Sequence, residues 1–251
     1  MYYYSKNIER LIRFFKYLIP LSFKSNHKYQ NKNQITTTDT VMYLLKKKNF
    51  NPEFIIDVGC GYGEWTKKSL KYFKSSNYLL FDGDSSNQER LKKFTNKKLN
   101  LFYKICILSN KIKNIKFYNS GYGSSIYEEN NNTSLNVSNT VSTTLFNELL
   151  NIKIMQKNNL IKLDVQGSEI DILKGLGDKM KLFEVIILEV STVEYNKNAP
   201  LFFDVHSFMN NNNYKLYDIC DSKRLGNNNS FLIQFDAVFV NSNSNLWNHK
   251  Y

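Results

Sequence analysis

The sequence predicts an α/β protein built on a mostly parallel sheet of seven strands, with helices on both faces. Two observations carry this prediction. Apolar strand-like runs alternate with helical segments along most of the chain, and the first of these runs closes on an acid and a glycine-rich turn. Alternation of this kind is typical of parallel strands joined by crossover helices. At 251 residues, of which 42% are hydrophobic, the chain is long enough to bury one full core.

The expected strands are short runs rich in Ile, Leu, Val, Phe and Tyr. They cover residues 54–58, 77–82, 103–108, 160–165, 185–190, 215–219 and 237–241. Residues 112–144 interrupt the alternation, with a short strand at 115–118 and a glycine-serine turn at 121–125. We expect this segment to be either a substrate loop near the ligand-binding edge or an ordinary hairpin.

The first 50 residues are expected to form a helical arm ahead of a domain that covers residues 51–251. Apolar residues recur at helical spacing between positions 8 and 18, with Arg10, Arg13 and Lys16 among them. Because these charges interrupt the apolar run, it cannot span a bilayer, and no transmembrane segment is expected. We expect a helix packed on the main domain, with a substrate lid, a dimer contact or a membrane-surface helix as alternatives.

The turn after the first strand has the spacing of a nucleotide-binding site. Asp57 lies near the strand's end, and Gly59, Gly61 and Gly63 follow at alternate positions, with Tyr62 between the last two. Glycines let backbone N–H groups approach a ligand because they carry no Cβ. The G-x-G-x-G spacing differs from the G-x-G-x-x-G of a pyrophosphate-binding dinucleotide site.

A second acid supports the same site. Asp82 ends the next apolar run, at roughly the distance where α/β sheets place the carboxylate that holds ribose hydroxyls. A ribose without a pyrophosphate indicates S-adenosylmethionine (SAM) as the cofactor. The expected cofactor-binding residues are therefore the glycine turn with Asp57 and Tyr62, together with Asp82.

The chain is basic, with 34 Lys and Arg against 22 Asp and Glu and a formal net charge of +12. Such a charge attracts phosphates, nucleic acid or an anionic membrane surface, and a solubilising lysine-rich surface is the alternative. The three cysteines, Cys60, Cys106 and Cys220, form no metal-ligand spacing. They are expected to be free thiols in a reducing cytoplasm.

Residues 159–175, NLIKLDVQGSEIDILKG, resemble the signature of the FkbM family of SAM-dependent methyltransferases, K-I-D-V-E-G followed by an acidic residue and L-K-G. Further segments fit in the same order, at residues 123–127, 141–145, 185–190 and 235–240. The resemblance implies a Rossmann-like class I methyltransferase fold, with SAM as cofactor and Ser109 as a polar contact to the adenine. Gln166 stands where the family usually has Glu, and Gly61 where it usually has Asn. Gln keeps the shape and hydrogen bonding of Glu but loses its charge.

Methyl transfer to a hydroxyl needs alignment and a base that removes the proton. Asp164 and Glu189 lie at the ends of neighbouring expected strands, and we expect them to flank the reacting centre, one as base or as a hydroxyl-orienting group. A carboxylate at a strand end can also only cap the following helix. Lys162 is expected to bind an acidic acceptor or to pair with Asp164, and His206 is the reserve candidate for the base. A divalent metal held by the two carboxylates is left open, because hard oxygen ligands suit Mg²⁺.

The resemblance implies an O-methyltransferase acting on a sugar, and the basic charge favours a nucleotide-linked or phosphorylated sugar of surface polysaccharide assembly. The alternatives are an N-methyl or phosphate-O-methyl transferase on a small acidic metabolite, a nucleic-acid methyltransferase, and a non-catalytic SAM-binding protein. An amino-directed nucleic-acid enzyme needs a D/N-P-P-Y/F turn to hold a flipped base. Pro20, Pro52 and Pro200 are not adjacent, so no nucleic-acid partner is expected. The oligomeric state is open, with a homodimer among the alternatives.

Overall fold

The computed structural model of the protein describes residues 36–119, 121–130, 136–150, 152, 154 and 158–248. The helix expected between positions 8 and 18 lies outside these residues. The chain divides into one unit over residues 1–35 and a second over residues 36–251. Helix α3 (Thr38–Lys47) begins after the N-cap Thr37, whose side chain accepts from the Thr40 N–H. Helix α3 thus falls in the same unit as the sheet.

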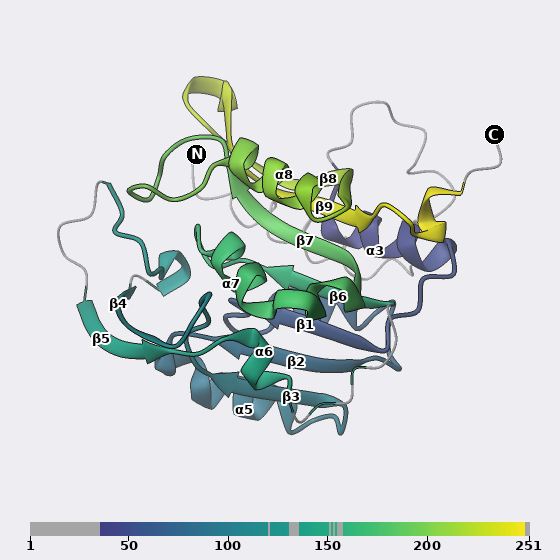
Figure 1. Cartoon of the computed structure of the whole chain (residues 1–251), viewed down its shortest axis with the longest axis horizontal. Helices are drawn as coiled ribbons and strands as arrows, with labels where there is room; N and C mark the ends of the chain where they lie inside the picture. Colours follow the sequence, from purple (N-terminus) through teal and green to yellow (C-terminus); the bar gives the residue numbers. More distant parts are fainter. Residues whose placement is uncertain are drawn as a thin grey trace, which may run out of the picture. The chain divides into compact units, whose positions relative to one another are not determined.

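Seven strands form the main sheet, in the order β3-β2-β1-β6-β7-β9-β8 (Figure 1). They are β1 (Phe54–Val58), β2 (Asn77–Asp82), β3 (Leu101–Ile105), β6 (Asn159–Leu163), β7 (Phe183–Ser191), β8 (Tyr214–Leu225) and β9 (Phe231–Asn241). Strand β9 runs antiparallel to both of its neighbours, and the other neighbouring pairs are parallel. The prediction of a Rossmann-like, mostly parallel seven-stranded sheet is confirmed.

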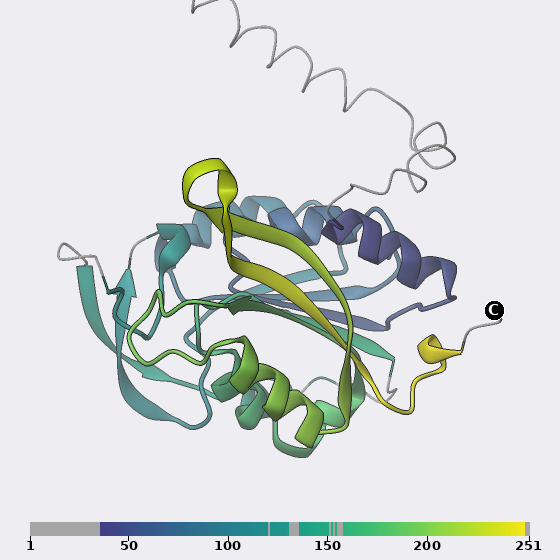
Figure 2. The same ribbon diagram turned by 90° about the horizontal axis from the view of Figure 1, so that it is seen from above.

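Helices cover both faces of the sheet (Figure 2). Helices α3, α4 (Glu64–Ser69) and α5 (Gln88–Thr95) lie on one face, and α6 (Leu145–Glu148), α7 (Glu169–Leu176) and α8 (Phe202–Asn211) lie on the other. Successive side chains of a strand point to opposite faces, and β1 shows the result. Ile55 packs in the cluster of α3, whereas Ile56 packs in the cluster that contains Leu173 of α7.

Strands β8 and β9 are much longer than the expected residues 215–219 and 237–241. Their outer parts form a hairpin in which Lys223 pairs in register with Gln234. The outer part of β8 is mostly polar (residues 221–224, DSKR) and lacks the apolar pattern from which the inner part was predicted. The outer part of β9 (residues 231–235, FLIQF) is apolar and was missed by the prediction. Strand β3 ends at Ile105 rather than at residue 108, because Leu108 leaves the sheet and bridges Thr143 instead.

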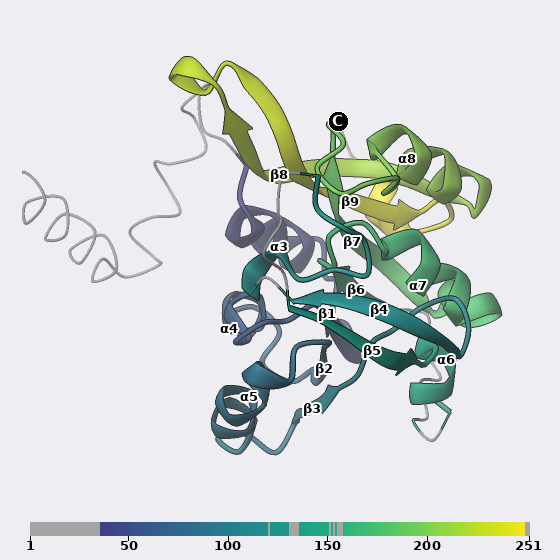
Figure 3. The same ribbon diagram turned by 90° about the vertical axis from the view of Figure 1, so that its left-hand side faces the viewer.

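The segment 112–144 forms a separate two-stranded antiparallel ribbon of β4 (Lys113–Asn119) and β5 (Asn136–Ser142) (Figure 3). It is thus a hairpin, and four residues of its connection, Gly121, Ser124, Ser125 and Ile126, line the cleft described below. In the described part of the chain, no helix has the length and apolar character that crossing a membrane requires.

Candidate functional site

A cleft opens at the carboxyl ends of the parallel strands. Its volume is about 1100 Å³, with the open mouth included. The polar part of its lining includes Tyr62, Asp84 and Asn87, and the apolar part includes Ile107 and Phe117. It lies where the chain order reverses, between β1 with β2 on one side and β6 on the other. Open α/β sheets bind their ligands at such a switch point.

The glycine turn forms one wall of this cleft. Gly59, Gly61 and Gly63 all have positive φ, at 73°, 52° and 76°, a conformation that other residues rarely adopt. A Cβ added to Gly59 would lie 1.8 Å from the Asp164 carbonyl oxygen, and one on Gly63 would lie 2.6 Å from the Phe94 ring. At Gly61 an added Cβ meets nothing within 4 Å. Gly59 and Gly61 line the cleft, whereas Gly63 serves the close packing of helix α4.

Asp82 holds the turn and keeps room for a ligand. Its Oδ2 accepts from the Gly61 N–H at 2.7 Å, and its Oδ1 accepts from the Asp84 N–H at 2.8 Å and from Asn87 Nδ2 at 3.0 Å. A carboxylate offers about four acceptor positions, so one remains for a donor such as a ribose hydroxyl. Burial raises the pKa of Asp82 despite these three donors. The remaining acceptor position on Asp82 and the open space at Gly61 fit the ribose end of SAM.

Asp57 lies behind the turn rather than in the cleft. It is buried and accepts from Thr66 Oγ1 at 2.5 Å. Burial raises its pKa to about 7. This side-chain hydrogen bond ties the end of β1 to helix α4, and Asp57 does not line the cleft.

Ser109, the expected adenine contact, is fully buried and does not line the cleft. Its backbone N–H donates to the Thr143 carbonyl at 2.9 Å. The apolar wall is formed instead by neighbours such as Ile107 and Leu108, which leave β3 just before it. Phe117 of the β4–β5 ribbon, also in this wall, has no local sequence signal that would predict its place.

Three acidic side chains gather beside the cleft. Oxygen atoms of Asp164, Glu189 and Asp236 lie within 4.8 Å of one another. Glu189 of β7 and Asp236 of β9 face each other in the antiparallel ladder, and Asp164 follows the last residue of the neighbouring strand β6. Like charges placed directly opposite each other destabilise a sheet unless cations compensate them.

Two ammonium groups supply that compensation. Lys162 Nζ, on a side chain only 2% exposed, lies 2.8 Å from Asp236 Oδ1 and 3.4 Å from Asp164 Oδ2. Burial alone would lower the pKa of Lys162, but the carboxylates outweigh it and raise the pKa. Lys223 Nζ lies 2.7 Å from Glu189 Oε1. The three carboxylates are one of two groups of described residues with the proximity of metal ligands, and a divalent cation there would compete with the Lys162 ammonium.

Gln166 connects the carboxylates through its side-chain amide. Its Nε2 donates to Asp164 Oδ1 at 3.3 Å and also to Glu189 Oε2, and its Oε1 accepts from Gln234 Nε2 at 3.4 Å. Its backbone has a φ of 56°, which places this residue in a sharp turn after β6. A glutamate here would bring a further negative charge against two carboxylates, whereas the amide brings a donor.

Burial and neighbouring charges give Glu189 and Asp164 different pKa values. Burial, followed by the charge of Asp164, raises the pKa of Glu189 to about 8. Burial also acts to raise the pKa of Asp164, but Lys162 outweighs it and lowers that pKa. At neutral pH the pair therefore holds one proton, mainly on Glu189, and the two groups titrate together. A base works best when its pKa is near the operating pH, which suits Glu189 to proton removal.

His206 lies elsewhere, on helix α8. Its ring centroid is 5.8 Å from that of Phe202 and 6.2 Å from that of Phe239. It lines neither the cleft nor the carboxylate cluster. The structure thus places the reserve candidate for the base among aromatic packing contacts.

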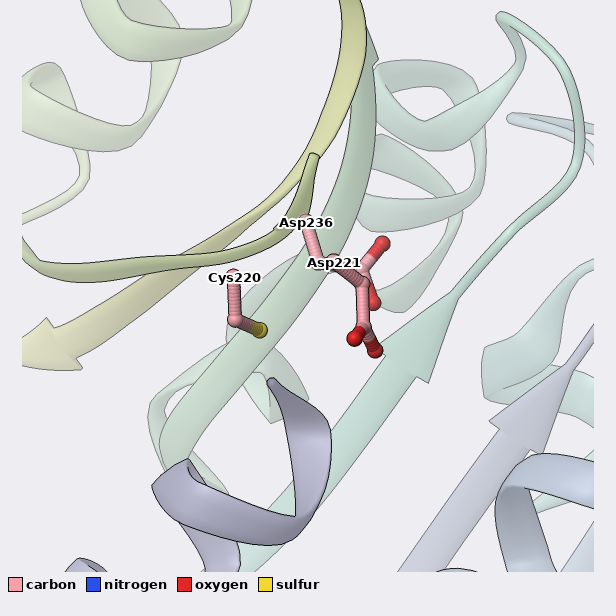
Figure 4. Close-up of side chains that lie close together, drawn as sticks. All are labelled: Cys220, Asp221 and Asp236. Atoms are coloured by element: carbon pink, nitrogen blue, oxygen red, sulfur yellow. The ribbon is translucent and has the colours of Figure 1, made fainter. Parts of the chain in front are cut away.

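A second group of side chains, Cys220, Asp221 and Asp236, has the proximity of metal ligands (Figure 4). Asp221 already accepts from the Thr38 N–H at 3.2 Å and from its hydroxyl, so it ties helix α3 to β8. Burial and nearby acids raise the pKa of the Cys220 thiol, which keeps it from becoming a thiolate ligand. We assign this group a structural role.

A family model described as the methyltransferase FkbM domain matches residues 60–216. No curated protein matches the chain.

Solved structures similar to this one are distant in sequence. A SAM-dependent methyltransferase from Clostridium acetobutylicum has 11% identity and a TM-score of 0.47, covering 92% of this chain and 99% of that one. Precorrin-6y C5,15-methyltransferase from Geobacter metallireducens has 10% identity and a TM-score of 0.45, covering 83% and 91%. Magnesium protoporphyrin IX methyltransferase from Synechocystis, with bound SAM, has 12% identity and a TM-score of 0.44, covering 82% and 78%.

Proposed function

The chain belongs to the FkbM family of SAM-dependent methyltransferases, and we propose that it methylates a hydroxyl of a sugar. The sugar is carried on a nucleotide or a phosphate and serves surface polysaccharide synthesis of the capsule or lipopolysaccharide type in the cytoplasm. The observation that supports a hydroxyl acceptor is the pair Asp164 and Glu189, because a hydroxyl must lose its proton to a base and Glu189 has a suitable pKa.

The cofactor residues in this proposal are those of the turn. SAM supplies a methyl group on a sulfonium. Gly59, Gly61 and Tyr62 form the wall beside it, and Asp82 accepts from the ribose. Asp57 and Gly63 act from behind the wall: Asp57 ties β1 to helix α4, and Gly63 lets the start of α4 pack closely against Phe94 of α5.

The residues on the acceptor side of the site have different roles. Glu189 takes the proton of the acceptor hydroxyl, and the Asp164 carboxylate raises the proton affinity of Glu189 through its charge. Gln166 keeps both carboxylates in place through its Nε2 donor. Lys162 neutralises the buried part of the cluster, which makes it a positioning residue rather than an acceptor-binding one.

The net charge of +12 supports an anionic carrier on the sugar, since a basic surface raises the local concentration of phosphate-bearing substrates. Lys223 lines the cleft with a side chain that is 56% exposed, and its Nζ lies 2.7 Å from Glu189 Oε1.

The test is a methyl-transfer assay with purified full-length protein. SAM is incubated with a panel of nucleotide sugars, sugar phosphates and free sugars, with and without EDTA, and mass spectrometry follows the addition of a methyl group. We expect methylation of a nucleotide sugar or sugar phosphate. Methylation of only amines, phosphate oxygens or nucleic acid in a parallel panel would refute the sugar assignment.

A further inference from the structure

The base of the proposed reaction is shielded from the cleft. The Glu189 side chain is only 4% exposed, and Glu189 does not line the cleft. Its two carboxylate oxygens are held by two residues that do line it. Gln166 Nε2 donates to Oε2, and Lys223 Nζ donates to Oε1 at 2.7 Å. An acceptor hydroxyl in the cleft can therefore reach Glu189 only after one of these two contacts opens.

The contact with Gln166 is the fixed one. The Gln166 carbonyl accepts from Ser125 Oγ at 2.9 Å and from Asn196 Nδ2 at 2.7 Å. Its side-chain Nε2 donates to Asp164 Oδ1 at 3.3 Å as well as to Glu189. Because the backbone and the side chain are both tied to other segments, the turn after β6 holds this amide against the Glu189 carboxylate.

The contact with Lys223 is the one that can open. The Lys223 side chain is 56% exposed and belongs to the outer hairpin of β8 and β9, and lysine carries its ammonium on a flexible four-carbon stem. An ammonium has three donors. Two of them serve Glu189 Oε1 and Gln234 Oε1, the latter at 3.0 Å. Among the described residues no acceptor takes the third, so this donor is available to a group in the cleft.

The lining of the cleft offers an anion one cationic side chain. Lys223 is the only Lys or Arg among the described residues of this lining. A phosphate of a ligand bound in the cleft therefore has a single ammonium with which to pair. Hydrogen bonds between an ammonium and a phosphate are charge-assisted and roughly twice as strong as neutral ones. Such a phosphate thus competes with Glu189 Oε1 for the Lys223 ammonium.

We propose that Lys223 selects an acceptor that carries a phosphate on the sugar ring itself. In the free protein its ammonium covers Glu189. The phosphate draws the ammonium away, and the acceptor hydroxyl replaces it as the donor to Glu189 Oε1, so the buried carboxylate keeps a partner. Because the ammonium moves no further than one side chain can swing, the phosphate and the methylated hydroxyl lie close together. The inference rests on the proposed function and names the residue that makes it specific for phosphorylated sugars.

The first experiment measures binding rather than turnover. Full-length protein saturated with S-adenosylhomocysteine (SAH) is titrated in a calorimeter with hexose 1-phosphates, nucleotide sugars and the matching free hexoses. We expect a phosphate-bearing member to bind wild type, and its affinity to fall by about tenfold or more in Lys223→Met, as for the loss of a charge-assisted hydrogen bond. Arg224→Met is the matched control, because Arg224 is the next residue of the same strand and does not line the cleft. Its affinity should stay within about twofold of wild type.

Two further readouts separate a role in selection from a structural one. Lys223→Arg keeps the cation and should bind the phosphate-bearing ligand more tightly than Lys223→Met does. The second readout is the ratio of kcat/KM for the phosphorylated sugar to kcat/KM for its neutral form. We expect Lys223→Met to lower this ratio by about tenfold or more, whereas a general loss of stability would lower both values together.

Three binding results would overturn the inference: equal affinity of wild type and Lys223→Met for the phosphate-bearing ligand, equal losses in Lys223→Met and Arg224→Met, or no phosphate-bearing ligand bound by wild type. A comparable loss of SAH affinity in Lys223→Met would also overturn it, because the ammonium would then belong to the carboxylate of the cofactor.

The methyl-transfer panel remains a separate measurement. A phosphorylated sugar methylated equally well by wild type and Lys223→Met would refute the role of Lys223 and leave the proposed function standing. Phosphate binding that depends on Lys223, together with methylation of amines alone, would refute the sugar assignment and leave the phosphate contact in place.

Discussion

The glycine turn and the carboxylate cluster meet at one cleft, which Gly59, Gly61 and Asp164 line, but they are built in different ways. The turn draws its geometry from the backbone of residues 57–63, where positive φ angles and missing Cβ atoms shape the cleft wall. The cluster draws its properties from side chains on three strands, in which the charges of Asp164, Glu189 and Asp236 are set against Lys162. The glycine turn should therefore tolerate a change of charge better than a change of shape. The carboxylate cluster should tolerate a change of shape better than a change of charge.

The largest expected effect tests the chemistry of the cluster. Glu189→Gln keeps the shape but removes the base, and we expect kcat to fall by about 10²–10⁴-fold, the usual contribution of such a group. In wild type the base must be ionised, so the rate should rise with pH up to about 8, where Glu189 titrates, and then level off. Measured pH profiles check this. A variant with near-normal turnover and the same profile would show that Glu189 is not the base.

The next effect concerns the stability of the cluster. Lys162→Met leaves buried carboxylates without their cation, and we expect the free energy of unfolding to fall by about 3–5 kcal/mol. Urea denaturation measures it. Lys181→Met is the control, because Lys181 pairs with Asp178 in a fully solvated ion pair worth at most about 1 kcal/mol. The double variant Lys162→Met/Asp236→Asn should recover part of the loss, and equal losses in Lys162→Met and the control would contradict the role of the buried ammonium.

The third prediction addresses the turn. Asp82→Ala removes an acceptor for the ribose, and we expect SAM affinity to fall by about 10–100-fold, as for a hydrogen bond to a charged group. Calorimetric titration of the folded variant measures it. Because Asp82 also accepts from Gly61 and Asn87, some stability is lost as well, which circular dichroism monitors. Asp178→Ala, on the exposed surface, should bind SAM as wild type does, and an unchanged affinity in Asp82→Ala would remove Asp82 from the site.

The smallest expected effect is a shift in the pH profile when Gln166 is changed. Gln166→Glu replaces a donor by a carboxylate beside two others, which raises the pKa of Glu189 further, so the rise in rate should move to higher pH by on the order of one unit. The pH profile of kcat/KM measures it. Asn210→Asp adds the same charge on the exposed end of helix α8 and should leave the profile unchanged. A profile of Gln166→Glu that does not move would mean that the amide does not set the titration of the pair.

The sequence predicts the backbone turn better than it predicts the side-chain cluster. Asp82 and the glycines that line the cleft were predicted, because their geometry depends on a few neighbouring residues. The proximity of Asp164 and Glu189 was predicted from their places at strand ends, and their roles in the reaction stay a prediction. Lys223 was not predicted, because it lies on the outer hairpin, where no apolar pattern marks the strand.

The partners of Lys162 show the limit most clearly. Its contact with Asp236 joins positions 74 residues apart and depends on the register of β7 with β9, which local periodicity cannot supply. Ser109 was placed at the adenine by resemblance, yet the chain turns away after Ile105 and buries it. Local backbone geometry is thus encoded in short stretches of sequence, while the charge arrangement requires the complete sheet.

The contact between Gly59 and Asp164 has a consequence for how such a protein can change over evolution. Because the space at Gly59 is smaller than a methyl group and its neighbour is the Asp164 backbone, a side chain at position 59 would displace the strand end that carries the carboxylate. In the proposed mechanism, the turn that holds SAM and the carboxylate that acts beside the base therefore share one mutational constraint.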